Sequence, residues 1–522
     1  MCKQSWMSLA DGPSSALPKS LRLRRFHSPG MYMFKKIKVG HAIIVTLTAL
    51  MVSASVLGAS EMELRIYDAT TAFRHFAFRL KPDHTMLDYD RGSIVETVFK
   101  TKIIENKYLK VTLLPEYGGR ILSLVYKPTG HEELYQNPVG SPYGIGEGNF
   151  YYNWLMVYGG IFPTFPEPEH GKTWCLPWKT RIVAQTPDEI GVEMSFVDDI
   201  TPVPGVPAKF NKGRTGLICT TTVWVYKDSP YLKLHVKLQN PQDKPVDYEY
   251  WTCTTLAPGS QPGKTLSPGE SEIIAPIGRV KSKDDWWRWM GSVDKPIDAT
   301  RHIFEFKNLA TFANWADMGI AYAYPKVEGS FWGVVNHVNE EGLFRVADNP
   351  NVTPGLKLWT WGYKQSYATD PGSFGNAARP YIELWAGHSP EFFVNASLAA
   401  HEVKDWDEYY IPTVGLPKVT FANVHALVYL DYAMDEEKAH VFHAKVFTTH
   451  PGETMDLLLR IKGDSQPELY HKSFTGTADQ SLELDLGQAA GSLAAGKYAF
   501  EMVLKSSSGA VLAQTSLTFE VK

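Results

Sequence analysis

The 522-residue sequence has little cysteine and no surplus of positive charge. Its four cysteines are Cys2, Cys175, Cys219 and Cys253. They lack the spacing of a zinc site or a disulfide framework, and without Cys2, which lies in the expected leader, at most one disulfide forms. After residue 60, 44 basic residues stand against 55 acidic ones, and no basic stripe occurs. Nucleic acid is therefore excluded as a partner.

The motifs of several common enzyme classes are also missing. The sequence contains no nucleotide-binding glycine loop, no serine-nucleophile elbow and no metalloprotease helix. We expect no metal and no cofactor. Calcium is the one ion that the adjacent acids Glu167 and Glu169 would suit, and nothing else in the sequence supports it.

Long apolar runs are missing apart from residues 42–60, which we interpret as an export signal. Lysines precede the run, and it ends in small residues that suit signal peptidase. It is short and rich in Ser and Thr for a membrane span, although a retained anchor is the alternative. We expect a signal segment over 1–60 with the true start at Met31 or Met33. The mature protein should then lie in the periplasm or outside the cell, without a stable membrane anchor.

β-Strand patterns, in contrast, are abundant. Apolar residues alternate with polar ones over many segments, and no amphipathic helix of convincing length appears. We predict an all-β protein, with a lead-in over 61–92 and a large antiparallel supersandwich over 93–412. Beyond a Pro- and Gly-rich boundary, short strands at regular spacing predict a small immunoglobulin-like sandwich over 416–522. The expected strands include 107–115, 118–126, 189–197, 220–241, 247–256, 440–449, 454–463, 496–506 and 513–522.

The segment LPEYGGRILSLVYKPTGHEELYQNP (114–138) resembles a bacterial family of unknown function with a galactose-mutarotase-like fold. The resemblance continues in family order between residues 93 and 410. It runs through 159–171, 229–245, 331–348, 357–362 and 380–390. It implies a supersandwich with a carbohydrate cleft. One departure concerns Phe162, which stands where many members of the family carry a glutamate.

Two residues are the candidate catalytic pair. His170 lies in a loop of prolines, glycines and aromatic residues (158–178), where a neutral-pH acid could act on a sugar; a plain loop histidine is the alternative. Glu383 shares a strand face with Tyr381 and Trp385, and poor solvation there would raise its pKa and suit it to act as a base. The resemblance supports Glu383, because mutarotases place their catalytic glutamate on a late strand. A structural ion pair is the alternative.

Further polar and aromatic residues are candidates for substrate binding. Arg120 would fork onto a sugar carboxylate or sulfate, or else form a structural salt bridge. Aromatic rings stack on sugar faces, although a large core also consumes aromatic residues. The expected substrate-binding residues are Arg120, Tyr152, Asn153, Phe165, Glu167, Glu169, Trp174, Trp359 and Trp361.

These features predict an exported carbohydrate-active protein that binds and processes a glycan. Two alternatives stay open. One is a lyase or dehydratase acting on a uronic-acid polysaccharide, with Arg120 or Asn153 neutralising the carboxylate and Tyr152 or His170 as base. The other is a glycan-binding protein without turnover. The oligomeric state is left open.

Overall fold

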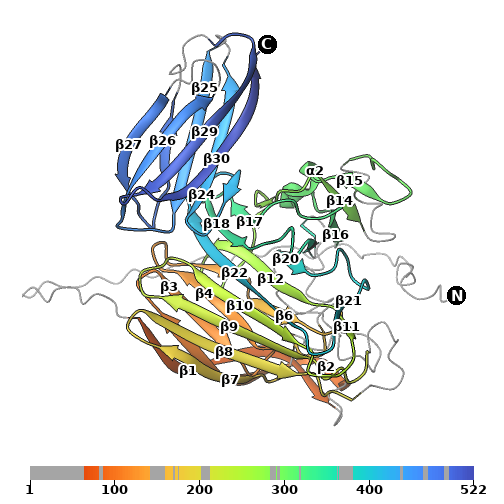
Figure 1. Cartoon of the computed structure of the whole chain (residues 1–522). Coiled ribbons are helices and arrows are strands. Elements are labelled where there is room, and N and C mark those ends of the chain that lie inside the picture. Colours follow the sequence, from red (N-terminus) through yellow and green to blue (C-terminus); the bar gives the residue numbers. More distant parts are fainter. Residues whose placement is uncertain are drawn as a thin grey trace, which may run out of the picture. The chain divides into compact units, whose positions relative to one another are not determined.

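The structure is a computed structural model, and it is built almost entirely of antiparallel strands (Figure 1). It describes residues 64–80, 86–140, 159–168, 171–174, 176–201, 212–282, 290, 294–316, 319–360, 362–363, 380–435, 439–462, 468–486 and 493–521. Among these residues the helical ones are Met290 and two short segments, α2 (Lys307–Ala310) and the 3₁₀ turn η3 (Phe312–Asn314).

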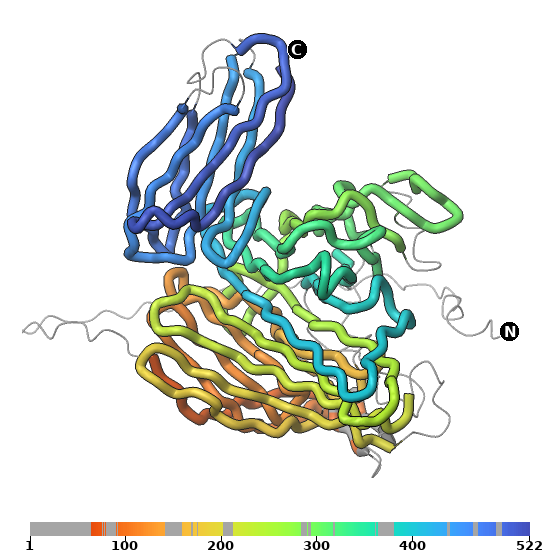
Figure 2. The backbone as a smooth tube through the Cα atoms, in the orientation of Figure 1, coloured from red at the N-terminus to blue at the C-terminus, as the bar shows by residue number. Residues whose placement is uncertain are grey.

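The largest sheet has 12 strands and begins with a long hairpin, drawn in red and orange in Figure 2. The first strand of this hairpin forms one edge of the sheet. In spatial order the strands are β1 (Arg65–Leu80), β2 (Met86–Glu105), β3 (Leu109–Leu114), β4 (Arg120–Tyr126), β5 (His131–Leu134), β12 (Trp251–Ser260), β20 (Ile382–Gly387), β19 (Gly355–Thr360), β16 (Gly319–Tyr324), β14 (Arg279–Ser282) and β15 (Ile303–Glu305), with β6 (Ile161–Thr164) against β12 and β4.

A second sheet has eight strands and packs against one face of the first. Its order is β13 (Glu272–Ile274), β17 (Phe331–Asn336), β18 (Glu341–Val346), β22 (Val403–Val414), β10 (Leu232–Gln239), β9 (Ile218–Tyr226), β8 (Glu189–Val197) and β7 (Lys179–Gln185). A separate pair consists of β11 (Val246–Tyr248) and β21 (Ala396–Leu398).

The main core lies between these two sheets, and strand periodicity explains it. In β10, Leu232, Leu234, Val236 and Leu238 are buried while the residues between them are partly exposed. Successive side chains of a strand point to opposite faces, so these four enter one core. The same core receives Leu384 and its apolar neighbours from β20 of the larger sheet.

The other face of the 12-stranded sheet is also covered, by an aromatic layer. Here Tyr381, which directly precedes β20, and Glu383 and Trp385 of β20 alternate with the main-core residues Ile382, Leu384 and Ala386. We call this surface of the sheet the site face. The aromatic layer on it consists of Phe73, Leu114, Tyr117, Leu122, Tyr135, Phe162, Trp174, Trp251, Cys253, Ala257, Ile320, Tyr322, Trp359, Tyr381, Trp385 and Phe392.

The C-terminal strands form two four-stranded sheets that enclose a core of their own, drawn in blue in Figure 1. One sheet holds β23 (Phe421–Ala422), β24 (Ala426–Met434), β25 (His440–Thr448) and β28 (Leu482–Asp485). The other holds β27 (Glu468–Thr475), β26 (Thr454–Lys462), β29 (Gly496–Ser506) and β30 (Val511–Val521). This confirms the predicted order of a large antiparallel supersandwich followed by a small sandwich.

The segment expected to be a lead-in proves to belong to the large sheet. Within 61–92, β1 and the start of β2 pair along the hairpin, so the sheet begins about 30 residues earlier than the sequence suggested. The pattern was missed because β1 is an edge strand. Apart from Phe73 and His75, its described side chains are exposed or only partly buried, so no apolar alternation marks it.

The boundary expected between the two sandwiches lies inside continuous packing. Leu416, Val419, Ala422, Leu427 and Phe447, all beyond the boundary, belong to the main core. The independence of the C-terminal sandwich therefore stays a prediction, and these contacts argue against it.

We expect a chain ending at Val414 to be less stable than the full chain, because it lacks those five core side chains. Burial of each large apolar side chain contributes about 1.5–3 kcal/mol, so the thermal midpoint should fall by at least ~5 °C in calorimetry. Leu416→Ala should destabilise the full chain by about 2–5 kcal/mol, and the exposed control Val511→Ala by little. A truncated chain as stable as the full chain would show that the sandwiches are independent.

Candidate functional site

Glu383 stands at the centre of the site face, on β20 between two neighbouring strands. Its backbone lies opposite Trp359 of β19 and Thr255 of β12. The side chain is 2% exposed. A carboxylate this deep must find its partners within the protein, because an unpaired buried charge costs several kcal/mol.

Those partners come from the same strand and from β19. Tyr381 Oη donates a hydrogen bond to Glu383 Oε1 at 2.8 Å, and Trp385 Nε1 donates to Oε2 at 2.8 Å. Lys357 Nζ lies 3.9 Å from Oε2. Residues two positions apart share a strand face, so the aromatic residues that flank Glu383 are its hydrogen-bond donors.

The protonation of Glu383 results from opposing effects. Burial raises the pKa of its carboxyl group above the ordinary value, as the sequence predicted, while the Lys357 ammonium and the Tyr381 and Trp385 hydrogen bonds favour the charged form. The direction of this pKa shift therefore agrees with the prediction. The aromatic neighbours Tyr381 and Trp385, however, lower the pKa of Glu383 through their hydrogen bonds, whereas poor solvation beside them was expected to raise it.

Lys357 is a site-face residue that the sequence analysis missed. Its side chain is 4% exposed, and Nζ lies 3.5 Å from the ring centroid of Trp385 and 4.8 Å from that of Phe392. The ammonium is thus stabilised by aromatic faces as well as by Glu383. The signal was present, since Lys357 and Trp359 alternate in KLWTWG and must share a face.

Arg120 is fully buried, and its guanidinium donates hydrogen bonds to backbone carbonyl groups. Its Nε, Nη1 and Nη2 donate to the carbonyl oxygens of Tyr117, Gly159 and Trp174 at 2.7, 2.9 and 2.8 Å. Its guanidinium carbon lies 4.4 Å from the ring centroid of Phe162, the residue that replaces a glutamate of the resembling family. The structure thus favours the structural role left open for Arg120, with carbonyls in place of a salt bridge.

The predicted loop 158–178 is tied down at two further points. Gly118 adopts a φ of +79°, and a Cβ there would stand 2.1 Å from the Trp174 carbonyl oxygen, so only glycine allows this approach. Gly118 N also donates to Leu176 O at 2.9 Å. The described parts of the loop are therefore anchored to the turn before β4.

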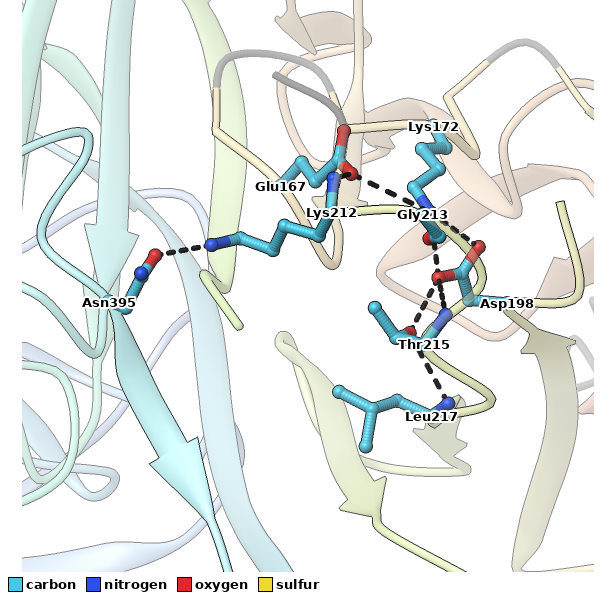
Figure 3. A network of polar contacts seen from close by, with 8 residues as sticks. All are labelled: Glu167, Lys172, Asp198, Lys212, Gly213, Thr215, Leu217 and Asn395. Atoms are coloured by element: carbon cyan, nitrogen blue, oxygen red, sulfur yellow. Dashed lines mark hydrogen bonds and ion pairs between the residues drawn. The ribbon is translucent and has the colours of Figure 1, made fainter. Parts of the chain in front are cut away.

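Glu167 belongs to a buried ion network that anchors the same loop (Figure 3). Lys172 Nζ contacts Asp198 Oδ1 and Oδ2 at 3.0 and 2.8 Å, and Glu167 Oε1 at 3.6 Å. Thr215 donates to Asp198 from both its backbone N and its Oγ1, and Lys212 N donates to Glu167 Oε1. Glu167 Oε2 accepts no hydrogen bond from the part of the chain that the structure describes. The network gives Glu167 structural partners.

The aromatic candidates divide between the two cores. Phe165, an expected substrate-binding residue, is fully buried in the main core against Tyr248 and Tyr250. Trp174 and Trp359 lie in the aromatic layer, and both are buried, with exposures of 0% and 4%. Trp359 has polar neighbours in the sequence, but both faces of its strand are buried.

Several predictions concern residues outside those that the structure describes. These residues are His170, Glu169, Tyr152, Asn153, Trp361, Cys175 and the signal segment 1–60. The pairing of His170 with Glu383 therefore stays a prediction. Cys219 and Cys253 are free, buried thiols. Cys253 lies on the site face, where burial and the negative charge of Glu383 raise its pKa, while Lys357 and Arg120 oppose that effect.

Within the described ranges, no group of three or more His, Cys, Asp or Glu side chains is arranged to hold a metal ion. No helix in those ranges has the length and hydrophobicity needed to cross a membrane.

The Glu167 network predicts a pH-dependent stability. Burial raises the pKa of Glu167 from 4.5 to about 8, so the folded chain holds this proton more tightly than the unfolded chain. Its contribution to stability is present below pH 4.5 and is lost as the pH rises to about 8.

Replacing the carboxyl by a neutral amide removes this dependence. The unfolding free energy of Glu167→Gln minus that of the wild type should rise between about pH 5 and pH 8 and then level, by up to ~1.4 kcal/mol per pKa unit. Denaturant unfolding at several pH values measures it, with the exposed Glu328→Gln as control. A difference independent of pH would show that Glu167 is ionised throughout.

Comparison with known proteins gives a match over part of the chain. Residues 84–191 match the model of a "Domain of unknown function (DUF5107)". This segment includes Arg120, Phe162, Glu167 and Lys172, but neither Lys357 nor Glu383.

Among solved structures, a TPR-domain containing protein from Parabacteroides distasonis is similar at 18% identity with a TM-score of 0.52. The match covers 69% of this chain and 59% of that one, so this chain corresponds to little more than half of that protein. A galactose mutarotase-like protein from Clostridium acetobutylicum has 10% identity and a TM-score of 0.42, covering 67% and 99% of the two chains. A galactose mutarotase related enzyme from Lactobacillus acidophilus has 11% identity and a TM-score of 0.38, covering 62% and 100%. The expected all-β, antiparallel fold class is confirmed, and the chain carries a DUF5107 match over residues 84–191.

Proposed function

We propose that this is an exported carbohydrate-active protein whose site face binds a glycan and carries out acid/base chemistry through Glu383. One observation carries the proposal: a buried carboxylate with a raised pKa stands among aromatic rings on the face of the sheet not used for the main core. Aromatic faces stack on sugar rings, and a carboxylate whose pKa approaches the working pH is suited to proton transfer.

Glu383 is the residue to which the reaction is assigned, and its surroundings suit a base. Tyr381 keeps its phenolic proton, because burial and the charge of Glu383 both raise its pKa. It therefore remains a donor that orients Glu383 Oε1. With Trp385 on Oε2, the carboxylate is held in one orientation, which is the preorganisation that proton transfer requires.

His170 is proposed as the complementary acid, and a glycan as the ligand. The alternative of a uronic-acid lyase loses Arg120 as the group that neutralises the substrate carboxylate, because the Arg120 nitrogens donate to three backbone carbonyls. Asn153 is left as the candidate for that role. A binding protein without turnover is the other alternative, and the same experiment separates it.

We predict that Glu383→Gln abolishes turnover while folding and binding persist. Glutamine keeps the size, its one carbonyl oxygen can accept from Trp385, and its amide N–H can donate to the Tyr381 hydroxyl oxygen. Because the amide cannot take a proton, kcat/KM should fall by about 10²–10⁴-fold. Mutarotation of freshly dissolved hexoses by polarimetry, and cleavage of neutral and uronic-acid oligosaccharides by chromatography, measure activity. Calorimetry of the same sugars measures binding. His170→Ala should have a comparable effect.

The control is Glu391→Gln, a half-exposed carboxylate that pairs with Lys281 Nζ at 2.8 Å. Full activity in Glu383→Gln would place the reaction elsewhere. Tight binding with no turnover by the wild type would establish a glycan-binding protein.

Export is the second part of the proposal, and it depends on the sequence of residues 42–60. We predict that the mature chain begins between about residues 55 and 61. N-terminal sequencing of the protein from its native host, with cell fractionation, measures this. A cytoplasmic protein that retains Met33 would contradict it.

A further inference from the structure

Two glutamates of this chain sit in the same kind of local cradle. Glu383 lies between Tyr381 and Trp385, and Glu408 lies between Trp406 and Tyr410. In both cases the aromatic residues two positions before and after donate to the carboxylate. Trp406 Nε1 and Tyr410 Oη reach Glu408 at 2.8 Å each, and the two bonds to Glu383 are also 2.8 Å.

Both carboxylates are also deeply buried, with exposures of 2% and 0% for Glu383 and Glu408. Each receives one indole N–H and one phenol O–H. The flanking donors and the burial are therefore matched, and any difference in behaviour must come from the other partners.

The cations differ in distance and in bonding. Arg345 Nε lies 2.9 Å from Glu408 Oε2, a charge-assisted hydrogen bond, and Thr252 Oγ1 adds another at 2.9 Å. Lys357 Nζ lies 3.9 Å from Glu383 Oε2, beyond hydrogen-bonding distance. In agreement, the pKa of Glu408 is lowered, because the Arg345 charge and the hydrogen bonds outweigh the effect of burial. Burial raises the pKa of Glu383.

Aromatic contacts explain why Lys357 stands back from the carboxylate. In the strand register Lys357 lies opposite Trp385, not opposite Glu383. Its ammonium is 3.5 Å from the Trp385 ring centroid, closer than it is to the carboxylate oxygen. The register thus limits the ion pair and leaves Glu383 with an ammonium nearby that does not hold it as tightly as Arg345 holds Glu408.

We propose that Lys357 is the positioning residue for Glu383, and that this loosened ion pair sets the pH at which the carboxylate becomes available as a base. The inference rests on the proposed function and deepens it. Several titratable or charged groups of the described elements surround Glu383. They are Lys357 of β19, Cys253 of β12, Arg120 of β4, Tyr381 just before β20, and Tyr135, which follows β5 and stacks on Tyr381.

The first test is the pH profile of kcat/KM. Lys357→Met removes the charge that favours the carboxylate, so the acidic limb should move to higher pH by about 1–3 units. Lys357→Arg restores the charge on a side chain that can hydrogen-bond Glu383 as Arg345 does Glu408. The acidic limb of the Lys357→Arg profile should lie at the pH of the wild-type limb or below it. The matched control is Lys281→Met, from the Lys281–Glu391 pair on β14 of the same sheet, which should leave the profile unchanged.

A second measurement needs no substrate and keeps the proposal testable if one variant is inactive. The unfolding free energy of the wild type minus that of Glu383→Gln should fall with rising pH and level off at the folded-state pKa of Glu383. In the Lys357→Met background the levelling should come at a pH about 1–3 units higher.

The outcomes separate this inference from the proposed function. The role of Lys357 is overturned if Lys357→Met moves neither the pH at which the stability difference levels off nor the acidic limb of the kcat/KM profile. This holds even if Glu383→Gln is inactive. If Glu383→Gln keeps full activity, the proposed reaction is overturned. If Lys357→Met still shifts the pH at which the stability difference levels off, the coupling of Lys357 to Glu383 stands.

Discussion

The central strands of the 12-stranded sheet are buried on both faces, and this burial dictates how their polar side chains are paired. One face packs on the eight-stranded sheet, and the other carries the aromatic layer. A polar side chain on either face cannot turn to water, so each charge must be neutralised inside the protein. Glu383 meets this requirement with an indole, a phenol and an ammonium, and Arg120 meets it with three carbonyl oxygens.

The same burial explains how the segment 158–178, which includes strand β6, is held in place. Arg120 donates to the carbonyls of Gly159 and Trp174. Lys172, 1% exposed, joins the part of the segment after β6 to Asp198. Two buried cations thus do what a covalent link does in smaller proteins. Their carbonyl and carboxylate partners are costly to leave unpaired, so the loop conformation is tied to the sheet beneath it.

The candidate site combines residues inside the DUF5107 match with residues outside it. Arg120, Phe162 and Lys172 lie within the DUF5107 match, and they shape the loop and the turn before β4. Lys357 and Glu383 lie far beyond it, on β19 and β20, and they supply the ionisable pair. The Phe162 ring faces the Arg120 guanidinium, whose carbon lies 4.4 Å from the ring centroid. The two ionisable groups assigned to the site face, Lys357 and Glu383, thus lie on late strands outside the matched segment.

The sequence by itself determined the alternation of most strands, the all-β class and the face that Glu383 shares with Tyr381 and Trp385, because these depend on neighbours one or two residues away. It also contained the cradle of Glu408, which has the same local pattern. Tertiary structure alone decided which core each residue entered, so Phe165 went to the main core and Trp359 became buried. It also decided the register of β19 against β20, which places Lys357 over Trp385 and 3.9 Å from Glu383. Pairing between strands some 20 residues apart depends on the packing of whole sheets, and no local pattern specifies the distance from a cation to a carboxylate.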